Sequence, residues 1–380
     1  MLQKSGSKEV PLEIKNSLYK LYTCGKFELV IEKFKSLIIE FPHSTFLFNL
    51  SGSTNLALKK LELAIKNFEA ACKINPNLPE SYYNLGLAFY LIGKIEKAIN
   101  SYKKALLLKP NYADAYCNLG MAQQIQGNFK DAICSYKKSI KCNPNFVGSY
   151  FNLGYLFTSI GKLDLAIINY KKAISLDPSY YEAYLNLGNV FKSRGKLSSS
   201  IYYYKKAIDL NPKSYEGLCN LSNVYTEIKN ISNAIKNAKL AIKLDKSKSE
   251  AIQNIGVIYF KLKKYSLAKK YFENALQKNI FPNNLFTQLA HCQINLFDFK
   301  TGEKNLRISF EKLIKEKDNT PNLLDNFSQI FFGLNYNPDY SAEQIYSYYN
   351  QFDQKFGVPL KKYWQPFPQI KKNKPKLKIG

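Results

Sequence analysis

The chain has 380 residues, of which 46% are hydrophobic and 22% are charged. This composition supplies enough apolar surface for an ordered core and excludes a wholly disordered chain. Lysines and arginines number 55 against 29 acids, for a formal charge of +26. Only Arg194 and Arg307 are arginines, so nearly all the positive charge comes from lysine. Lysine lacks the planar guanidinium group that binds phosphate and guanine through two hydrogen bonds. The composition therefore disfavours nucleic acid as a partner.

Targeting and metal-binding signals are absent from the sequence. No run approaches the roughly 18 apolar residues of a membrane span, and the N-terminus has no apolar stretch typical of an export signal. Seven scattered cysteines form no C-x-x-C pair, and only two histidines occur, which favours small buried thiols in a reducing compartment over disulfides or a metal site. We expect a cytoplasmic protein without metal or cofactor.

From Pro11 to Pro282 the sequence repeats every 34 residues, in eight units without insertion, behind a short tail at 1–10. Repeats of this length indicate stacked supersecondary units. Position 8 is small in the last six units: Gly86, Gly120, Gly154, Gly188, Ser222 and Gly256. Position 24 is aromatic in seven units: Phe34, Phe68, Tyr102, Tyr136, Tyr170, Tyr204 and Phe272.

Each unit is predicted to be a helical hairpin, which makes the chain all-α. Apolar and small residues at positions 4, 7, 8 and 11, and again at 20, 24 and 27, follow helical spacing in two separate runs. Six units end in proline, which stops the second helix. Glycines that can end the first helix stand at position 15 in five units: Gly25, Gly93, Gly127, Gly161 and Gly195.

This pattern resembles the tetratricopeptide repeat, and the resemblance covers 272 residues (eight units of 34). It implies a right-handed superhelical solenoid of helical hairpins over 11–282, with a concave groove for an extended polypeptide, followed by an irregular helical C-terminal segment. Some packing positions depart from the pattern and are expected to loosen single joints without changing the fold: Val30, Leu37, Ser139, Ser200 and Ala238.

Position 6 carries a polar residue beside the buried position 7. Apart from Leu50, it is always asparagine: Asn16, Asn84, Asn118, Asn152, Asn186, Asn220 and Asn254. An amide both donates and accepts hydrogen bonds, so this column can pair with the backbone of an extended peptide without reading its side chains. The alternative is a structural role, in which each asparagine bonds to the neighbouring hairpin.

Position 2, one helical turn earlier, is acidic in five units: Glu80, Asp114, Glu182, Glu216 and Glu250. These carboxylates share a helix face with the asparagines and can contact a bound peptide. Alternatively they only complement the dipole at the start of each helix. Aromatic residues near this face are further candidates for the groove: Tyr83, Tyr90, Phe151 and Tyr155.

Lysine pairs recur at positions 25 and 26, after the buried aromatic residue of the second helix. They are Lys103-Lys104, Lys137-Lys138, Lys171-Lys172 and Lys205-Lys206. We expect them on the convex side, outside the groove. They form either a solvated face or a docking surface for an acidic partner or an anionic surface.

Behind the eighth unit we expect a partial ninth repeat or junction at 283–317, a helical linker at 318–370 and a basic tail at 371–380. The strings Leu289–Gln293 and Phe297–Phe299 resemble the junction of protein O-linked N-acetylglucosamine transferases and SPINDLY-like relatives. Leu377–Gly380 resembles the start of their first catalytic strand.

This second resemblance implies a substrate-recognition arm that stops before its catalytic domain and works with a partner chain that carries that domain. The asparagine and acidic columns then correspond to the two ladders of the family's groove. These residues alone are expected to transfer no sugar, with no catalytic role for His291. Three functions stay open: this arm, an independent tetratricopeptide scaffold, and a basic module for nucleic acid or anionic surfaces.

Overall fold

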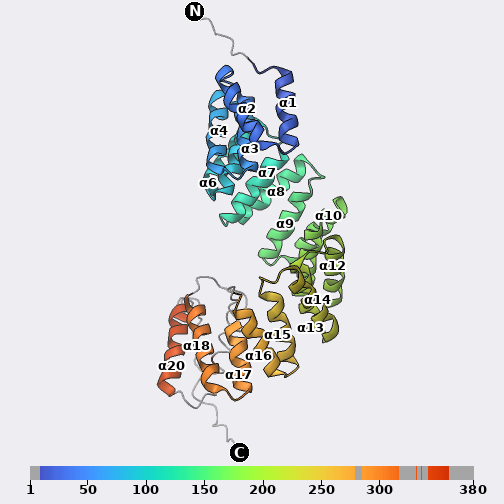
Figure 1. The fold of residues 1–380 in the computed structure, drawn as a ribbon, viewed down its shortest axis with the longest axis vertical. Coiled ribbons are helices and arrows are strands. Elements are labelled where there is room, and N and C mark those ends of the chain that lie inside the picture. Colours follow the sequence, from blue (N-terminus) through green and yellow to red (C-terminus); the bar gives the residue numbers. More distant parts are fainter. Residues whose placement is uncertain (1–8, 279–284, 316–330, 332–334, 336–340, 359–380) are drawn as a thin grey trace, which may run out of the picture. The chain divides into compact units, whose positions relative to one another are not determined.

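The computed structural model describes residues 9–278, 285–315, 331, 335 and 341–358 (Figure 1). They belong to two compact units, 1–211 and 212–380. The first unit is a series of helical hairpins: α1 (Leu12–Thr23) and α2 (Phe27–Glu40), α3 (Thr45–Ala57) and α4 (Leu61–Ile74), α5 (Pro79–Leu91) and α6 (Ile95–Leu108), α7 (Ala113–Ile125) and α8 (Phe129–Cys142), α9 (Val147–Ser159) and α10 (Leu163–Leu176), α11 (Tyr181–Ser193) and α12 (Leu197–Leu210).

The second unit continues the same pattern with α13 (Tyr215–Glu227) and α14 (Ile231–Leu244), α15 (Glu250–Lys261) and α16 (Tyr265–Leu276), α17 (Leu285–Asn295) and α18 (Phe299–Lys315). Where the sequence predicts only part of a ninth repeat, α17 and α18 form both helices of a pair. Then come α20 (Ala342–Phe352), which starts with a capping box between Ser341 and Gln344, and the π-helical turn η1 (Asp353–Gly357). Most of the expected linker, the basic tail and the string Leu377–Gly380 lie outside the described residues.

The all-α fold predicted from the repeat is confirmed: the described residues contain no strand. Within the first unit, each second helix packs between two first helices, as α6 does between α5 and α7. Successive first helices also contact one another, α5 with α7, α7 with α9 and α9 with α11. The first helices of this unit therefore form its inner row and the second helices its outer row.

A close contact between positions 8 and 24 joins the two helices of most hairpins. A β-carbon added to Gly154 would stand 2.7 Å from the ring of Tyr170, which is completely buried. Five other hairpins repeat this contact, at 2.5 to 2.7 Å, through Gly52 and Phe68, Gly86 and Tyr102, Gly120 and Tyr136, Gly188 and Tyr204, Gly256 and Phe272. At each of these positions only glycine leaves room for the ring.

The seventh hairpin changes both members of this pair. Ser222 replaces the glycine and Ala238 replaces the ring, and both are fully buried. The Ser222 hydroxyl donates to the carbonyl of Ala234 over 2.9 Å. Ser200 and Ser139, which also depart from the repeat pattern, donate in the same way to backbone carbonyls over 2.9 and 2.7 Å. These departures are therefore accommodated with their polar atoms satisfied.

Each hairpin turn has a left-handed residue at position 15. The five glycines found there have φ between 69° and 82°, a region that glycine enters without steric cost. Non-glycine residues take the same conformation in the other repeats: Lys59, Lys229, Lys263 and Phe297 have φ between 58° and 63°. Backbone strain is therefore concentrated at four turns.

We expect Gly154→Ala to lower the free energy of unfolding by about 1–3 kcal/mol, because the new methyl group overpacks the helix pair against Tyr170. Gly148→Ala in the same helix is the matched control. Its added carbon would meet only the Phe146 ring, at 3.5 Å, and alanine has the higher helix propensity. Urea denaturation of both variants checks this, and a Gly154→Ala variant as stable as the wild type would contradict it.

Lys229→Gly is expected to raise the free energy of unfolding by about 0.5–1 kcal/mol, because it removes the left-handed strain of a residue with a β-carbon. Lys236→Gly, at an exposed position inside α14, should instead cost about 1 kcal/mol through lost helix propensity. Thermal denaturation compares the two variants. If both glycines were destabilising, the turn at Lys229 would be unstrained.

Alkaline pH should destabilise the fold, because burial raises the pKa of several cysteine thiols and tyrosine hydroxyls. The pKa of Cys72 rises from 9.0 to about 11, and the pKa of Cys219 and of Cys292 to about 12. The pKa of Tyr170 and of Tyr180 rises from 10.0 to about 12. The unfolded chain loses these protons first, so stability falls as pH rises above about 9. Urea denaturation at pH 7, 9 and 10.5 measures this, and equal midpoints at all three values would contradict it.

Candidate functional site

In the first unit, two position-6 asparagines tie neighbouring hairpins together. The Asn118 amide donates to the Tyr83 hydroxyl over 3.1 Å, and the Asn152 amide donates to Cys117 Sγ over 3.3 Å. Both acceptors occupy position 5 of the preceding repeat. These bonds use one amide proton each, and they support a structural role for the column.

The second unit repeats this bond at α15. The Asn254 amide donates to the carbonyl of Cys219, again at position 5 of the preceding repeat, over 3.4 Å. Asn254 is only 8% exposed, whereas Asn220 on α13 is half-buried. The side chain of Asn254 therefore offers little surface to a ligand.

Asn186 and Asn84 differ from Asn118 and Asn152. The Asn186 amide donates to the carbonyl of Glu182 in its own helix over 2.9 Å, so it makes no bond to another repeat. Asn84 makes no side-chain hydrogen bond within the described residues. Both side chains are half-buried on first helices, where their remaining donors and acceptors can reach a ligand.

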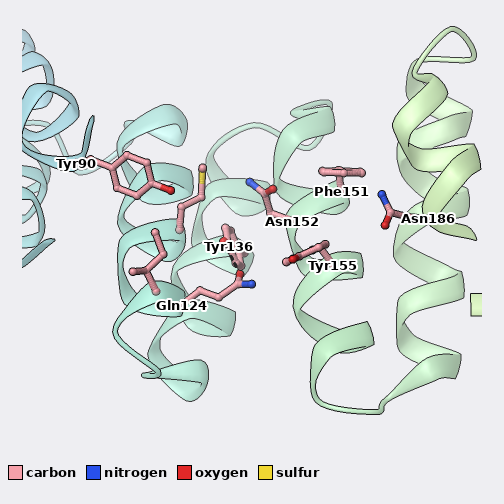
Figure 2. A pocket seen from close by; sticks show the side chains of 9 residues that line it. Tyr90, Gln124, Tyr136, Phe151, Asn152, Tyr155 and Asn186 are labelled. Carbon is pink, nitrogen blue, oxygen red and sulfur yellow. Dashed lines mark hydrogen bonds between the residues drawn. The ribbon is translucent and has the colours of Figure 1, made fainter. Parts of the chain in front are cut away.

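A cavity of about 440 Å³ lies along the inner row of the first unit. In Figure 2, Tyr90, Gln124, Asn152, Tyr155 and Asn186 project toward the same space from neighbouring helices. Most of its lining comes from α5, α7, α9 and α11, and α8 adds one ring. The nine lining residues are Tyr90, Met121, Gln124, Ile125, Tyr136, Phe151, Asn152, Tyr155 and Asn186.

The lining of this cavity is uncharged and offers both amides and aromatic rings. The Tyr136 hydroxyl, at the end of a buried ring, donates to the Gln124 side-chain oxygen over 3.1 Å. Burial raises the pKa of Tyr90, which keeps that phenol a neutral donor. Since no carboxylate, lysine or histidine lines the cavity, it can hold neutral polar and apolar groups and cannot form an ion pair with a ligand.

Models of the tetratricopeptide repeat match the chain at eight places, which overlap or directly adjoin one another. The matched residues are 52–93, 89–127, 113–146, 135–168, 154–193, 181–214, 215–248 and 249–277. The matches follow one another without a gap from residue 52 to residue 277. The chain belongs to the tetratricopeptide repeat family. A search of curated proteins finds no match.

Two solved structures of other tetratricopeptide proteins share this fold. A protein from Parabacteroides merdae is 16% identical, with a TM-score of 0.56 over 66% of this chain and 98% of its own. The Cut9–Hcn1 hetero-tetramer contains a chain that is 17% identical, with a TM-score of 0.53 over 73% of this chain and 54% of its own. MamA is 30% identical over 43% of this chain and 95% of its own, with a TM-score of 0.40.

The acidic residues at position 2 of the tetratricopeptide repeats stand in the first turn of each first helix. None of the five lines the cavity. Glu80 forms an ion pair with Lys109 over 3.2 Å, and Lys109 also lies 4.5 Å from the ring centre of Tyr112. This placement fits the helix-dipole alternative for Glu80.

The sequence pattern found part of the cavity and missed the rest. Three of the four aromatic candidates line it, whereas Tyr83 packs 5.0 Å from the ring of Tyr112 instead. Met121, Gln124, Ile125 and Tyr136 were missed. The first three occupy repeat positions 9, 12 and 13, which lie within one helical face with position 6. A search of that face could have found them.

The cysteines and His291 were also discussed in the sequence analysis, and the structure describes where they lie. Four cysteines are buried as expected, but the expectation is wrong for Cys24 and Cys134, which are exposed. The His291 ring lies 6.5 Å from that of Phe260. The described residues contain no cluster of metal-binding side chains. Among the described helices, none combines the length and apolar character needed to cross a membrane.

Proposed function

We propose that this chain is a polypeptide-binding tetratricopeptide scaffold, and that the cavity of the inner row holds part of an extended peptide. The uncharged lining of the cavity, drawn from four successive first helices, carries this proposal. An extended chain crossing several repeats presents amide groups and side chains in alternation. The inner row offers a matching set of amides and aromatic rings.

The amides of Asn152, Asn186 and Gln124 would bind the peptide backbone, each through a proton or lone pair that its internal hydrogen bond leaves over. Tyr155 and Phe151 would cover apolar side chains of the peptide. None of the other asparagines and acids predicted from the sequence lines the cavity, and a role for them in peptide binding stays a prediction: Asn84, Asn118, Asn220, Asn254, Glu80, Asp114, Glu182, Glu216 and Glu250. Of the asparagines predicted from the sequence, Asn152 and Asn186 are the two that line the cavity, and they are therefore the strongest candidates for peptide binding.

The neutral lining also limits what the cavity can select. Without lysine or arginine beside it, the cavity cannot grip a peptide's terminal carboxylate or an acidic motif by ion pairing. Selection would come from shape, apolar surface and backbone hydrogen bonds. These features suit a segment of neutral residues in extended conformation.

The narrower role, a substrate-recognition arm of a protein O-glycosyltransferase working with a catalytic-domain partner, rests on the short strings in residues 289–299 and 377–380. The matching family models describe the repeat and no glycosyltransferase. We therefore propose the independent scaffold first and the arm second. A cytoplasmic location is likewise a proposal, supported by seven unpaired cysteines.

Two single substitutions separate peptide binding from structural support. Asn186→Ala should weaken peptide binding about fivefold, the effect of one lost hydrogen bond, and leave stability unchanged, because Asn186 makes no bond to another repeat. Asn118→Ala, whose amide bonds to Tyr83 and does not line the cavity, should lower the free energy of unfolding by about 1 kcal/mol and leave affinity nearly unchanged.

The measurement is fluorescence anisotropy of labelled, reduced and carboxymethylated α-lactalbumin, an unfolded polypeptide. Salt at about 0.3 M screens attraction between the acidic probe and exposed lysines. Urea denaturation of the same samples reports stability. The proposal fails if the probe does not bind saturably, or if the two variants lose affinity equally.

A further inference from the structure

The outer row of the first unit carries an unusual surface on α6, α8, α10 and α12. Each of these helices carries one of the lysine pairs at repeat positions 25 and 26. All eight lysines are exposed and form no ion pair within the described part of the chain. We call this surface the lysine face; it comprises Lys103, Lys104, Lys137, Lys138, Lys171, Lys172, Lys205 and Lys206.

Acidic residues do little to neutralise the lysine face. The four helices contain 11 lysines and 4 acids. Asp164 is engaged by Arg194 over 2.6 Å, and only Asp209 stands within one turn of a lysine pair. Glu96 and Asp131 come about seven residues before the pairs, roughly 10 Å along the helix axis. The face therefore presents a strong local positive charge.

Bulky apolar and aromatic side chains stand on the same face. Leu107 is 83% exposed, Ile168 is 62% exposed and Tyr202 is 54% exposed. Each lies three and four residues from the lysine pair of its own helix, so the three share the lysines' side of the helix. Two of the lysines, Lys104 and Lys138, also lie 5.5 and 5.7 Å from the ring centres of Tyr82 and Tyr116. The lysine face thus combines lysines that form no ion pair with apolar groups that are more than half exposed.

We infer that the lysine face docks the protein on an anionic phospholipid bilayer. Lysine is a strongly hydrated point charge that attracts anionic headgroups, and Leu107, Ile168 and Tyr202 can enter the interface between headgroups and acyl chains. A nucleic acid would use the charge but would leave the aliphatic side chains in water. Docking would leave the cavity, which lies on the inner row, free to bind a peptide.

Flotation of the full chain with phospholipid vesicles tests this inference. The protein should bind phosphatidylcholine vesicles that contain about 30% phosphatidylserine and should not bind pure phosphatidylcholine, and raising salt should release it. Replacing Lys137, Lys138, Lys171 and Lys172 by Gln should weaken partitioning by about 600-fold, the product of a fivefold loss for each lysine. The matched control replaces four exposed lysines that precede second helices by Gln: Lys60, Lys94, Lys162 and Lys196.

The control lowers the net charge equally but should cost far less partitioning. The double variant Leu107→Ser and Ile168→Ser, with unchanged charge, should also bind the anionic vesicles severalfold more weakly. Equal losses in the two lysine variants, full binding by the serine variant, or no binding by the wild type would overturn the inference. A 30-nucleotide single-stranded DNA, followed by fluorescence anisotropy, tests nucleic acid as the alternative ligand. The inference would also be wrong if the lysine-face substitutions abolished DNA binding but left vesicle binding unchanged.

Discussion

The contact between a glycine on one helix and an aromatic ring on the next sets the spacing within most of the hairpins. With a ring 2.5 to 2.7 Å from where a β-carbon would stand, the two helices can approach only at glycine. The rings are fully buried, so this contact also provides the largest apolar groups of the core. Because the contact recurs every 34 residues, the hairpins share one geometry, which aligns equal repeat positions into columns.

Other core positions tolerate different chemistry because their contacts are less constrained. Positions 11 and 23 pair as stacked rings in the sixth and eighth hairpins, where Phe191 and Tyr203 lie 5.2 Å apart and Tyr259 and Tyr271 lie 5.5 Å apart. In the fourth hairpin the Ser135 hydroxyl instead donates to the Gln123 side chain over 2.7 Å. Either kind of pair joins the two helices of its hairpin.

The two rows of helices in the first unit have different surfaces because they use different repeat positions. The inner row presents neutral amides and rings around the cavity. The outer row presents lysines beside exposed aliphatic groups. Since the core needs only one side of each helix, the other side is free to carry charge or apolar groups without cost to the fold. A repeat protein can thus offer two independent surfaces from one motif.

The sequence by itself determined the hairpins, their boundaries near glycine and proline, and which core positions are small and which are aromatic, because these depend on the pattern within one 34-residue unit. It also predicted the exposed lysine pairs, because helical spacing separates them from the buried ring. Only the tertiary structure decided which asparagine side chains remain available to bind a ligand. Asn118 and Asn152 look identical to Asn186 in the repeat, yet their amides bond to residues 35 positions earlier. The cavity likewise draws its lining from several repeats, so its shape depends on how hairpins stack, which no single repeat encodes.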